Sequence, residues 1–187
     1  HIPLVMGSWN KKMAELAGQY CDELQVAESW DKKYLDLLYD ALRNGAKQSE
    51  RQTLPYFSIG GITCVSDNKQ KAYEKVKQTL AVYIPYLQTI MTYNGLDTEN
   101  DAYQAICNHS KNGRFKETEA LITDEMVEAL SLSGEHGEVR EKLDQLIADV
   151  NIRGILFSPP YGPSDDIEDN LKQISDKIVN KIKKKLR

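Results

Sequence analysis

Four short apolar segments, each followed by a stretch with helical periodicity, place the strongest limit on the fold of this chain. Strands are expected near residues 3–7, 23–27, 56–65 and 153–157. Between them, apolar residues recur three or four positions apart, which is typical of helices that bury one face. Strands that alternate with helices form parallel sheets with right-handed crossovers. The pattern therefore predicts an α/β protein with four parallel strands.

Capping residues predict where several helices begin and end. Gly45 is expected to end the helix that follows the second strand. Ser66 or Asp67 is expected to cap a long helix over residues 69–93, with a kink at Pro85. These signals predict helix boundaries, which can be compared with the structure.

The segment 96–133 has no strand pattern and is expected to be a helical insertion. Amphipathic helices are expected over 134–149 and 164–187. The whole chain, 1–187, is then a single domain built on a small open sheet, or half of an eight-stranded barrel, which takes about 250 residues or more. A chain that opens on a strand and closes on a helix favours a piece of a longer barrel.

Charge and cysteine content exclude several classes of function. The net charge of −4 gives no electrostatic footprint for nucleic acid, and no apolar run reaches the roughly 20 residues of a membrane span. The three cysteines are far apart in sequence, and the three histidines show no ligand spacing, so neither a disulfide framework nor a metal site is expected. This usage of cysteine favours a reducing, cytoplasmic location.

Two sequence blocks carry a family resemblance. Residues 3–22 read PLVMGSWNKKMAELAGQYCD, while residues 137–143 read GEVREKL and residues 155–163 read ILFSPPYGP. The first block resembles the strand, small-residue loop and K-M-x-x-L-A-G helix of the bacterial-luciferase-like flavin and deazaflavin oxidoreductase superfamily, although Glu23 stands where that family usually has glycine. The second resembles the ending of the branch that uses coenzyme F-420, closest to methylenetetrahydromethanopterin reductase-like proteins.

The resemblance implies a TIM (β/α)8 barrel of the luciferase-like type, of which this chain supplies about the last four βα units. It implies coenzyme F-420, or alternatively FMN, and hydride transfer between reduced deazaflavin and a small organic or pterin substrate. The catalytic groups of that family come largely from strands that are absent here, so no catalytic residue is assigned. The partner would be the missing amino-terminal half or a second copy of the chain.

Three alternatives remain open at the level of sequence. The first is an FMN-dependent monooxygenase of the same superfamily. The second is a non-catalytic half-barrel module that pairs with itself to cover its sheet edges. The third is a small doubly wound domain unrelated to luciferases.

The loop Gly7-Ser8-Trp9-Asn10-Lys11 is the expected cofactor site. It follows a strand and opens a helix, and helix amino termini offer free N–H groups that suit a phosphate. The resemblance implies the same role, because this loop holds the cofactor phosphate in the family. The alternative is an ordinary barrel loop in which Asn10 caps the helix.

Five further residues are expected to line the substrate side of the rim. Glu28, Ser29 and Trp30 follow the second strand, while Ser158 and Tyr161 follow the last strand. The alternatives are a helix cap beside a packed tryptophan for the first group, and a plain strand terminator for the second.

Three other features have simpler structural explanations. The Gly60-Gly61 pair within a strand predicts a bulge or a close approach of backbone. Cys64 is expected in the core rather than as a nucleophile, because no histidine lies near it in sequence. The basic residues of 181–187 are expected to be a solvated helix end.

Overall fold

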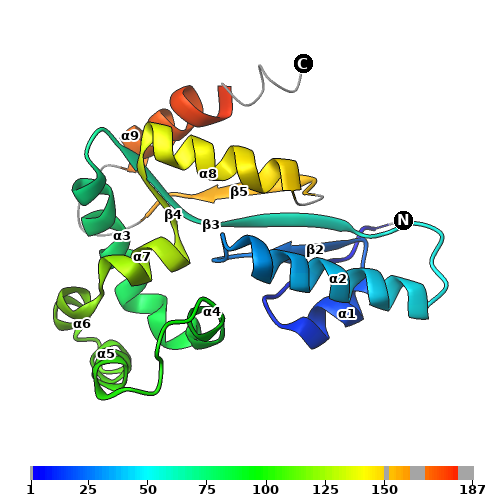
Figure 1. Cartoon of the computed structure of the whole chain (residues 1–187), viewed down its shortest axis with the longest axis horizontal. Helices are drawn as coiled ribbons and strands as arrows, with labels where there is room; N and C mark the ends of the chain where they lie inside the picture. The colour runs from blue at the N-terminus through cyan, green and yellow to red at the C-terminus, as the bar shows by residue number, and fades with distance from the viewer. Residues whose placement is uncertain (1, 150–151, 161–166, 181–187) are drawn as a thin grey trace. The chain divides into compact units, whose positions relative to one another are not determined.

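The computed structural model describes residues 2–149, 152–160 and 167–180 (Figure 1). The described residues divide into two compact units. The first is drawn from His1–Gly61 and Gln145–Leu156, and the second from Ile62–Asp144 and Phe157–Arg187.

The first unit is a parallel sheet whose strands alternate with helices. Its elements are β1 (Val5–Gly7), α1 (Lys11–Tyr20), β2 (Glu23–Val26), α2 (Lys32–Gln48) and the beginning of β3 (Tyr56–Ser66). β1 and β2 pair in parallel with Gly7 opposite Gln25, and β2 and β3 pair in parallel with Val26 opposite Ile59. β5 (Gly154–Ser158) also pairs with β3. The carboxyl ends of β1 and β2 therefore lie at one edge of the sheet, as the alternating pattern predicts.

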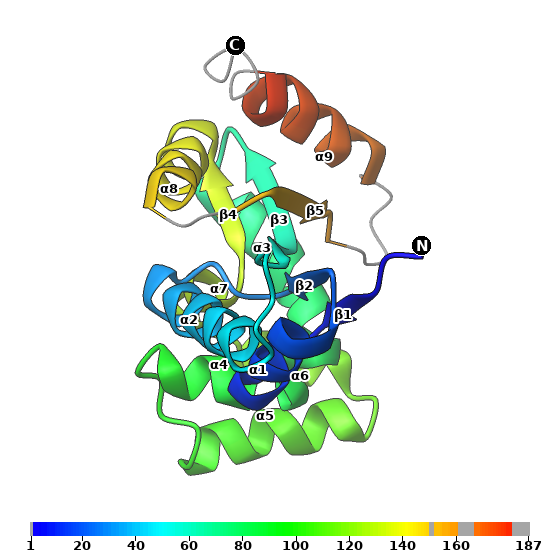
Figure 2. The same ribbon diagram turned by 90° about the vertical axis from the view of Figure 1, so that its right-hand side faces the viewer.

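A glycine on each helix brings α1 and α2 together, and they run side by side in both views (Figures 1 and 2). An added β-carbon on Gly18 would collide with the backbone of Leu42, and one on Gly45 would collide with the backbone of Glu15. The prediction that Gly45 ends the second helix is wrong, because α2 continues to Gln48. Close helix packing, rather than helix termination, is what requires a glycine there.

The second unit combines the end of β3 with a set of helices. These are α3 (Lys69–Tyr83), α4 (Gln88–Tyr93), α5 (Asp101–Lys111), α6 (Phe115–Leu121), α7 (Asp124–Leu130), α8 (His136–Asp149) and α9 (Ile167–Gln173). Residues of α8 from Gln145 onward belong to the first unit. α9 continues as π-helical turns over Ile174–Val179. Buried side chains from α3, α5 and α7, among them Leu80, Ile106 and Val127, form the core of this unit.

A fifth strand, β4 (Leu132–Glu135), pairs in parallel with residues Thr63–Ser66 of β3. The sequence predicted no strand between residues 65 and 153 and a helix from residue 134, so this part of the prediction is wrong. The strand has only four residues, LSGE, and Gly134 within it has a φ of 139°. Such a segment has little strand propensity of its own, so pairing with β3 is what makes it extended.

The predicted long helix over 69–93 is broken rather than kinked. α3 ends at Tyr83, a 3-10 turn covers Ile84–Tyr86, and α4 begins at Gln88. Pro85 lies in that turn and has no N–H to continue the helical ladder. Asn68, not Ser66 or Asp67, caps α3, because its side chain accepts a hydrogen bond from the backbone N–H of Lys71.

The side chain of Asn170 attaches α9 to β3. Its Oδ1 accepts from the N–H of Val65 at 3.3 Å, and its Nδ2 donates to the carbonyl of Thr63 at 3.3 Å. Asn170 is buried, so the carboxamide takes the place of a neighbouring strand at this point of β3. The predicted helix over 164–187 can be checked only in part, because residues 161–166 and the basic residues 181–187 lie outside the described residues.

Candidate functional site

The loop between β1 and α1 has open space in front of its backbone. Gly7 ends β1 and is exposed, and a β-carbon added to it would meet no atom within 4 Å. Ser8 and Trp9 are half-buried, whereas Asn10 and Lys11 are exposed. The predicted cofactor residues therefore form a short, accessible loop at the carboxyl end of a parallel strand, which is the end where α/β barrels place their ligands.

Several polar groups of this loop are already bonded within the chain. The Asn10 side chain accepts from the N–H groups of Lys12 and Met13 at 2.9 and 3.3 Å, so it caps α1. The Ser8 hydroxyl oxygen accepts from the N–H of Asn10 at 3.1 Å, and the Tyr34 hydroxyl donates to the carbonyl of Trp9. These contacts hold the loop in one conformation and occupy part of the helix amino terminus.

Other donors of the loop stay available. Within the described part of the chain, the N–H groups of Trp9 and Lys11 have no hydrogen-bond acceptor. The Ser8 hydroxyl proton is also available, because its oxygen acts only as an acceptor in the contact above. The Lys11 and Lys12 side chains are exposed beside these donors. An anion at this loop would thus meet two N–H groups, one hydroxyl and two cations.

The loop after β2 carries the second group of predicted residues in an unusual conformation. Glu28 has a φ of 55°, a left-handed value that costs a residue with a side chain about 1–2 kcal/mol. Gly61 of β3 lies against it, since an added β-carbon would be 2.8 Å from the Glu28 nitrogen. The Gly60-Gly61 pair is therefore a point of close backbone approach, because Gly60 likewise faces the backbone of Leu156 at 2.6 Å.

Ser29 and Trp30 place unpaired polar atoms inside the protein. The Ser29 hydroxyl and the Trp30 indole nitrogen are buried and, in the described part of the chain, have no hydrogen-bond partner. Leaving a buried donor unpaired costs about 1–3 kcal/mol. Asp31, rather than Ser29, caps α2 by accepting from the N–H of Tyr34 at 2.8 Å. The capping role that Ser29 could have had is therefore filled by another residue.

The first two groups of predicted residues lie at neighbouring strand ends. β1 and β2 pair in parallel, so the loops that carry Gly7 and Glu28 leave the same edge of the sheet. Ser158, the last residue of β5, is exposed and belongs to the second unit. Tyr161 lies outside the described residues.

The cysteines considered as reactive groups are buried and have a structural role. Cys21, Cys64 and Cys107 are buried free thiols. Burial raises the pKa of the Cys64 thiol to about 11, a shift that the nearby Lys75 charge reduces only in part, so the thiol is protonated at neutral pH and is a poor nucleophile. Among the described residues, no cluster of three or more histidine, cysteine, aspartate or glutamate side chains could hold a metal ion.

The sequence profile of luciferase-like monooxygenases matches residues 1–152. The chain belongs to the luciferase-like monooxygenase family. This luciferase-like chain is 25% identical over 181 residues to a 5,10-methylenetetrahydromethanopterin reductase of Methanopyrus kandleri, covering 95% of this chain and 50% of the relative. It is 24% identical to the reductase of the same name from Methanolobus tindarius, covering 95% of this chain and 54% of the relative. The chain spans about half the length of the curated relatives it matches.

Solved structures agree on the fold. The coenzyme F-420 dependent tetrahydromethanopterin reductase of Methanopyrus kandleri superposes with a TM-score of 0.76 at 22% identity, over 96% of this chain and 50% of that one. The oxygenating constituent of 3,6-diketocamphane monooxygenase from Pseudomonas putida, in complex with FMN, superposes with a TM-score of 0.57 at 16% identity. The match covers 95% of this chain and 48% of that one. The luciferase-like α/β barrel type expected from the sequence is confirmed, with this chain matching about half of each structure. No helix in the described ranges has the length and apolarity needed to cross a membrane.

Proposed function

We propose that this chain is part of an oxidoreductase that binds coenzyme F-420 and transfers a hydride between the reduced deazaflavin and a small organic or pterin substrate. The observation that carries the proposal is the β1–α1 loop, with open space at Gly7 beside spare N–H groups and two lysines. The relatives in sequence are reductases of methylenetetrahydromethanopterin, which supports this branch of the family.

The residues of the loop fit a phosphate group. Gly7 leaves room for close approach, because nothing lies within 4 Å of the position of a β-carbon. The N–H groups of Trp9 and Lys11 and the Ser8 hydroxyl would donate to the phosphate oxygens, and the ammonium groups of Lys11 and Lys12 would add charge. Asn10 would keep its role as helix cap and hold these donors in place.

The residues after β2 would bind a polar part of the cofactor or substrate on the same rim. The unpaired Ser29 hydroxyl and Trp30 indole N–H supply donors whose burial otherwise costs stability. The close contact of Gly61 with Glu28 holds this loop in its left-handed conformation. Both residues are fully buried in this chain, so binding would require them to become accessible.

The cofactor would supply the hydride chemistry, and the residues of this chain would bind and orient it. Catalytic residues stay unassigned, because about half of the length of the relatives is not matched by this chain. We propose that the unmatched half, or a second copy of the chain, completes the barrel along the exposed edge of β1.

The second candidate is an FMN-dependent monooxygenase of the same superfamily. The specific observation that favours it is the structural likeness to a monooxygenase that binds FMN. Because both cofactors carry a phosphate, the β1–α1 loop would serve either one. Affinity for F-420 and for FMN, measured side by side, separates the two functions.

Substitutions at Ser8 test the proposed phosphate site in the complete protein. Ser8→Ala removes one neutral donor and is expected to weaken cofactor binding by on the order of 1 kcal/mol. Ser8→Asp places an anion against the phosphate and should cost far more, and Gly7→Val should weaken binding by blocking approach. Titrations with F-420 and FMN measure the affinities. Equal affinity of wild type and Ser8→Asp would place the phosphate elsewhere.

A further inference from the structure

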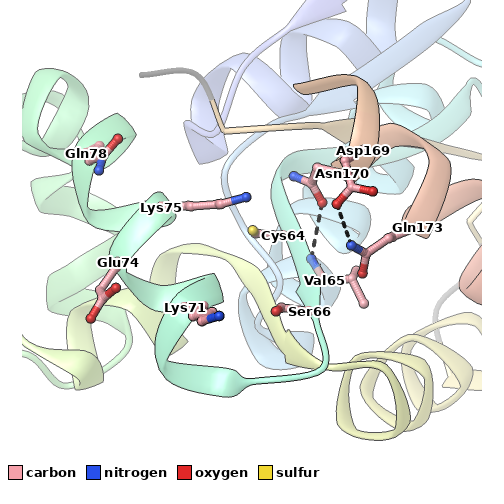
Figure 3. A pocket seen from close by; sticks show the side chains of 10 residues that line it. All are labelled: Cys64, Val65, Ser66, Lys71, Glu74, Lys75, Gln78, Asp169, Asn170 and Gln173. Atoms are coloured by element: carbon pink, nitrogen blue, oxygen red, sulfur yellow. Dashed lines mark hydrogen bonds between the residues drawn. The ribbon is translucent and has the colours of Figure 1, made fainter. Parts of the chain in front are cut away.

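A cavity of about 430 Å³ is lined entirely by residues of the second unit (Figure 3). Its floor is the end of β3, one wall is α3 and the opposite wall is α9. A volume of this size suits a small molecule. We propose that this cavity binds a small carboxylate that also carries a hydrogen-bond donor, such as a free amino acid, separately from the cofactor site.

The α9 wall is rigid because both of its carboxamides are already bonded. Asn170 is bonded through both amide atoms to the backbone of β3. Gln173 donates through Nε2 to Asp169 at 2.7 Å, and its Oε1 faces Nε2 of His136 at 3.2 Å. His136 in turn lies 3.2 Å from the carboxylate of Asp67. This chain of contacts fixes the orientation of Asp169, whose Oδ1 atom has no hydrogen-bond partner in the described part of the chain.

The α3 wall supplies positive charge to the cavity. Lys71 and Lys75 are one helical turn apart and both line it. Lys75 extends across the cavity toward Cys64 and Asn170 (Figure 3). An anion in the cavity would be attracted by both of these positive charges.

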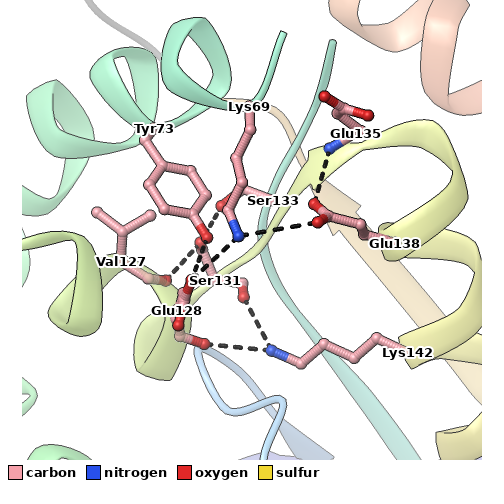
Figure 4. A network of polar contacts seen from close by, with 9 residues as sticks. All are labelled: Lys69, Tyr73, Val127, Glu128, Ser131, Ser133, Glu135, Glu138 and Lys142. Carbon is pink, nitrogen blue, oxygen red and sulfur yellow. Dashed lines mark hydrogen bonds and ion pairs between the residues drawn. The ribbon is translucent and has the colours of Figure 1, made fainter. Parts of the chain in front are cut away.

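Among the described residues, three other lysines of the same unit are bonded within the protein, whereas the ammonium group of the exposed Lys71 is not. Lys69 lies 3.2 Å from Glu128 and 3.9 Å from Glu138, and Lys142 donates to two backbone carbonyls (Figure 4). Lys77 pairs with Asp124 at 2.6 Å. In the described ranges, the Lys71 ammonium has no hydrogen bond or ion pair. A cation that faces a cavity without a protein partner is free to bind a ligand anion.

The charges around the cavity select the class of ligand. Lys71 and Lys75 line one wall and Asp169 lines the opposite wall, while Glu74 lines the cavity from the same helix as the lysines. A dianion such as phosphate would be repelled by these two carboxylates. A ligand with one carboxylate for the lysines and an ammonium or hydroxyl donor for Asp169 satisfies both walls.

Titration of the full chain with L-glutamate, L-alanine, succinate and inorganic phosphate tests the proposal. The measurements are calorimetry and the shifts of the Ser66 backbone and Asn170 side-chain amides in nitrogen-15 spectra. The amino acids are expected to bind and shift both signals, and succinate and phosphate to bind more weakly. No binding by either amino acid, or tighter binding of phosphate than of both, would overturn the proposal.

Matched lysine variants locate the binding. Lys71→Met is expected to weaken amino acid binding by about threefold to fivefold, and Lys71→Arg to retain it. Lys77→Met removes a lysine from the same helix outside the cavity and is expected to leave the affinity unchanged. Equal affinities of wild type and Lys71→Met would show that the amino acid binds elsewhere. Because none of these residues belongs to the β1–α1 loop, the outcome is independent of cofactor binding.

Discussion

A β-carbon on Gly61 would lie 2.8 Å from the backbone nitrogen of Glu28. This is closer than unbonded atoms approach in a relaxed structure, so only glycine lets β3 pass the loop after β2. The same loop carries the left-handed Glu28 and the buried, unpaired Ser29 and Trp30. The glycine of β3 therefore helps to set the position of one candidate binding loop.

Gly61→Ala is expected to destabilise the protein by about 2–4 kcal/mol. The added methyl group meets backbone, and the φ of 147° at this position is one that alanine rarely adopts. Gly113→Ala is the matched control, because its φ of 71° is also unfavourable for alanine but the space around it is open. The free energy of unfolding of Gly113→Ala should fall by only about 1 kcal/mol. Urea denaturation measures the free energy of unfolding of both variants. Equal losses of stability would mean that the contact with Glu28 is unimportant.

Asn170→Ala should lower the free energy of unfolding by about 1–3 kcal/mol. The substitution leaves the buried N–H of Val65 and carbonyl of Thr63 without the partner that the carboxamide supplies. Asn112→Ala is the control, because Asn112 is exposed and its side-chain bonds go only to Asn108. A loss for Asn170→Ala no larger than that of the control would show that α9 is held by other contacts.

Stability should fall at alkaline pH in a way that depends on Cys64. Burial raises the pKa of this thiol from 9.0 to about 11, so the folded state holds the proton more tightly than the unfolded state. The resulting contribution to stability is complete below pH 9.0 and is lost as the pH rises to about 11. Wild type should therefore lose more stability across this interval than Cys64→Ala, as followed by denaturation at several pH values. Parallel curves for the two proteins would contradict the assignment.

The 187-residue chain alone should self-associate. Among the described strands, β1 pairs only with β2. Val5 in β1 and Leu4 just before it are 55% and 57% exposed. An apolar edge strand of this kind invites pairing with another chain. Val5→Lys should reduce this self-association. Co-expression with the amino-terminal half of the barrel should also reduce it, because that half would pair with β1 in place of a second copy. Sedimentation velocity measures the association, and a sharp monomer at all concentrations would refute the expectation.

The alternation of strands and helices was sufficient to predict the parallel order of β1, β2 and β3 and the α/β class. Local signals also identified the Asn10 cap and the close backbone approach at Gly60 and Gly61. These features depend on residues near in sequence, or on a glycine pair that is unusual in a strand. They could therefore be predicted from short stretches of the chain.

Features created by distant contacts were missed. β4 is too short and polar to predict, and it is extended because it pairs with β3. Gly45 indicated a helix end, but its partner is the backbone of Glu15 on another helix. Asn170 gave no signal in sequence, since its partners are more than 100 residues away. The cavity between α3 and α9 also depends on that attachment, so it could not be predicted.

The most direct test of the proposed function is an equilibrium titration of the complete protein with F-420 and with FMN, followed by fluorescence. We expect saturable binding of one cofactor per barrel, with F-420 bound more tightly than FMN. Saturable binding with FMN tighter would favour the monooxygenase alternative. Failure of both cofactors to bind would contradict the account that this luciferase-like chain contributes a cofactor site.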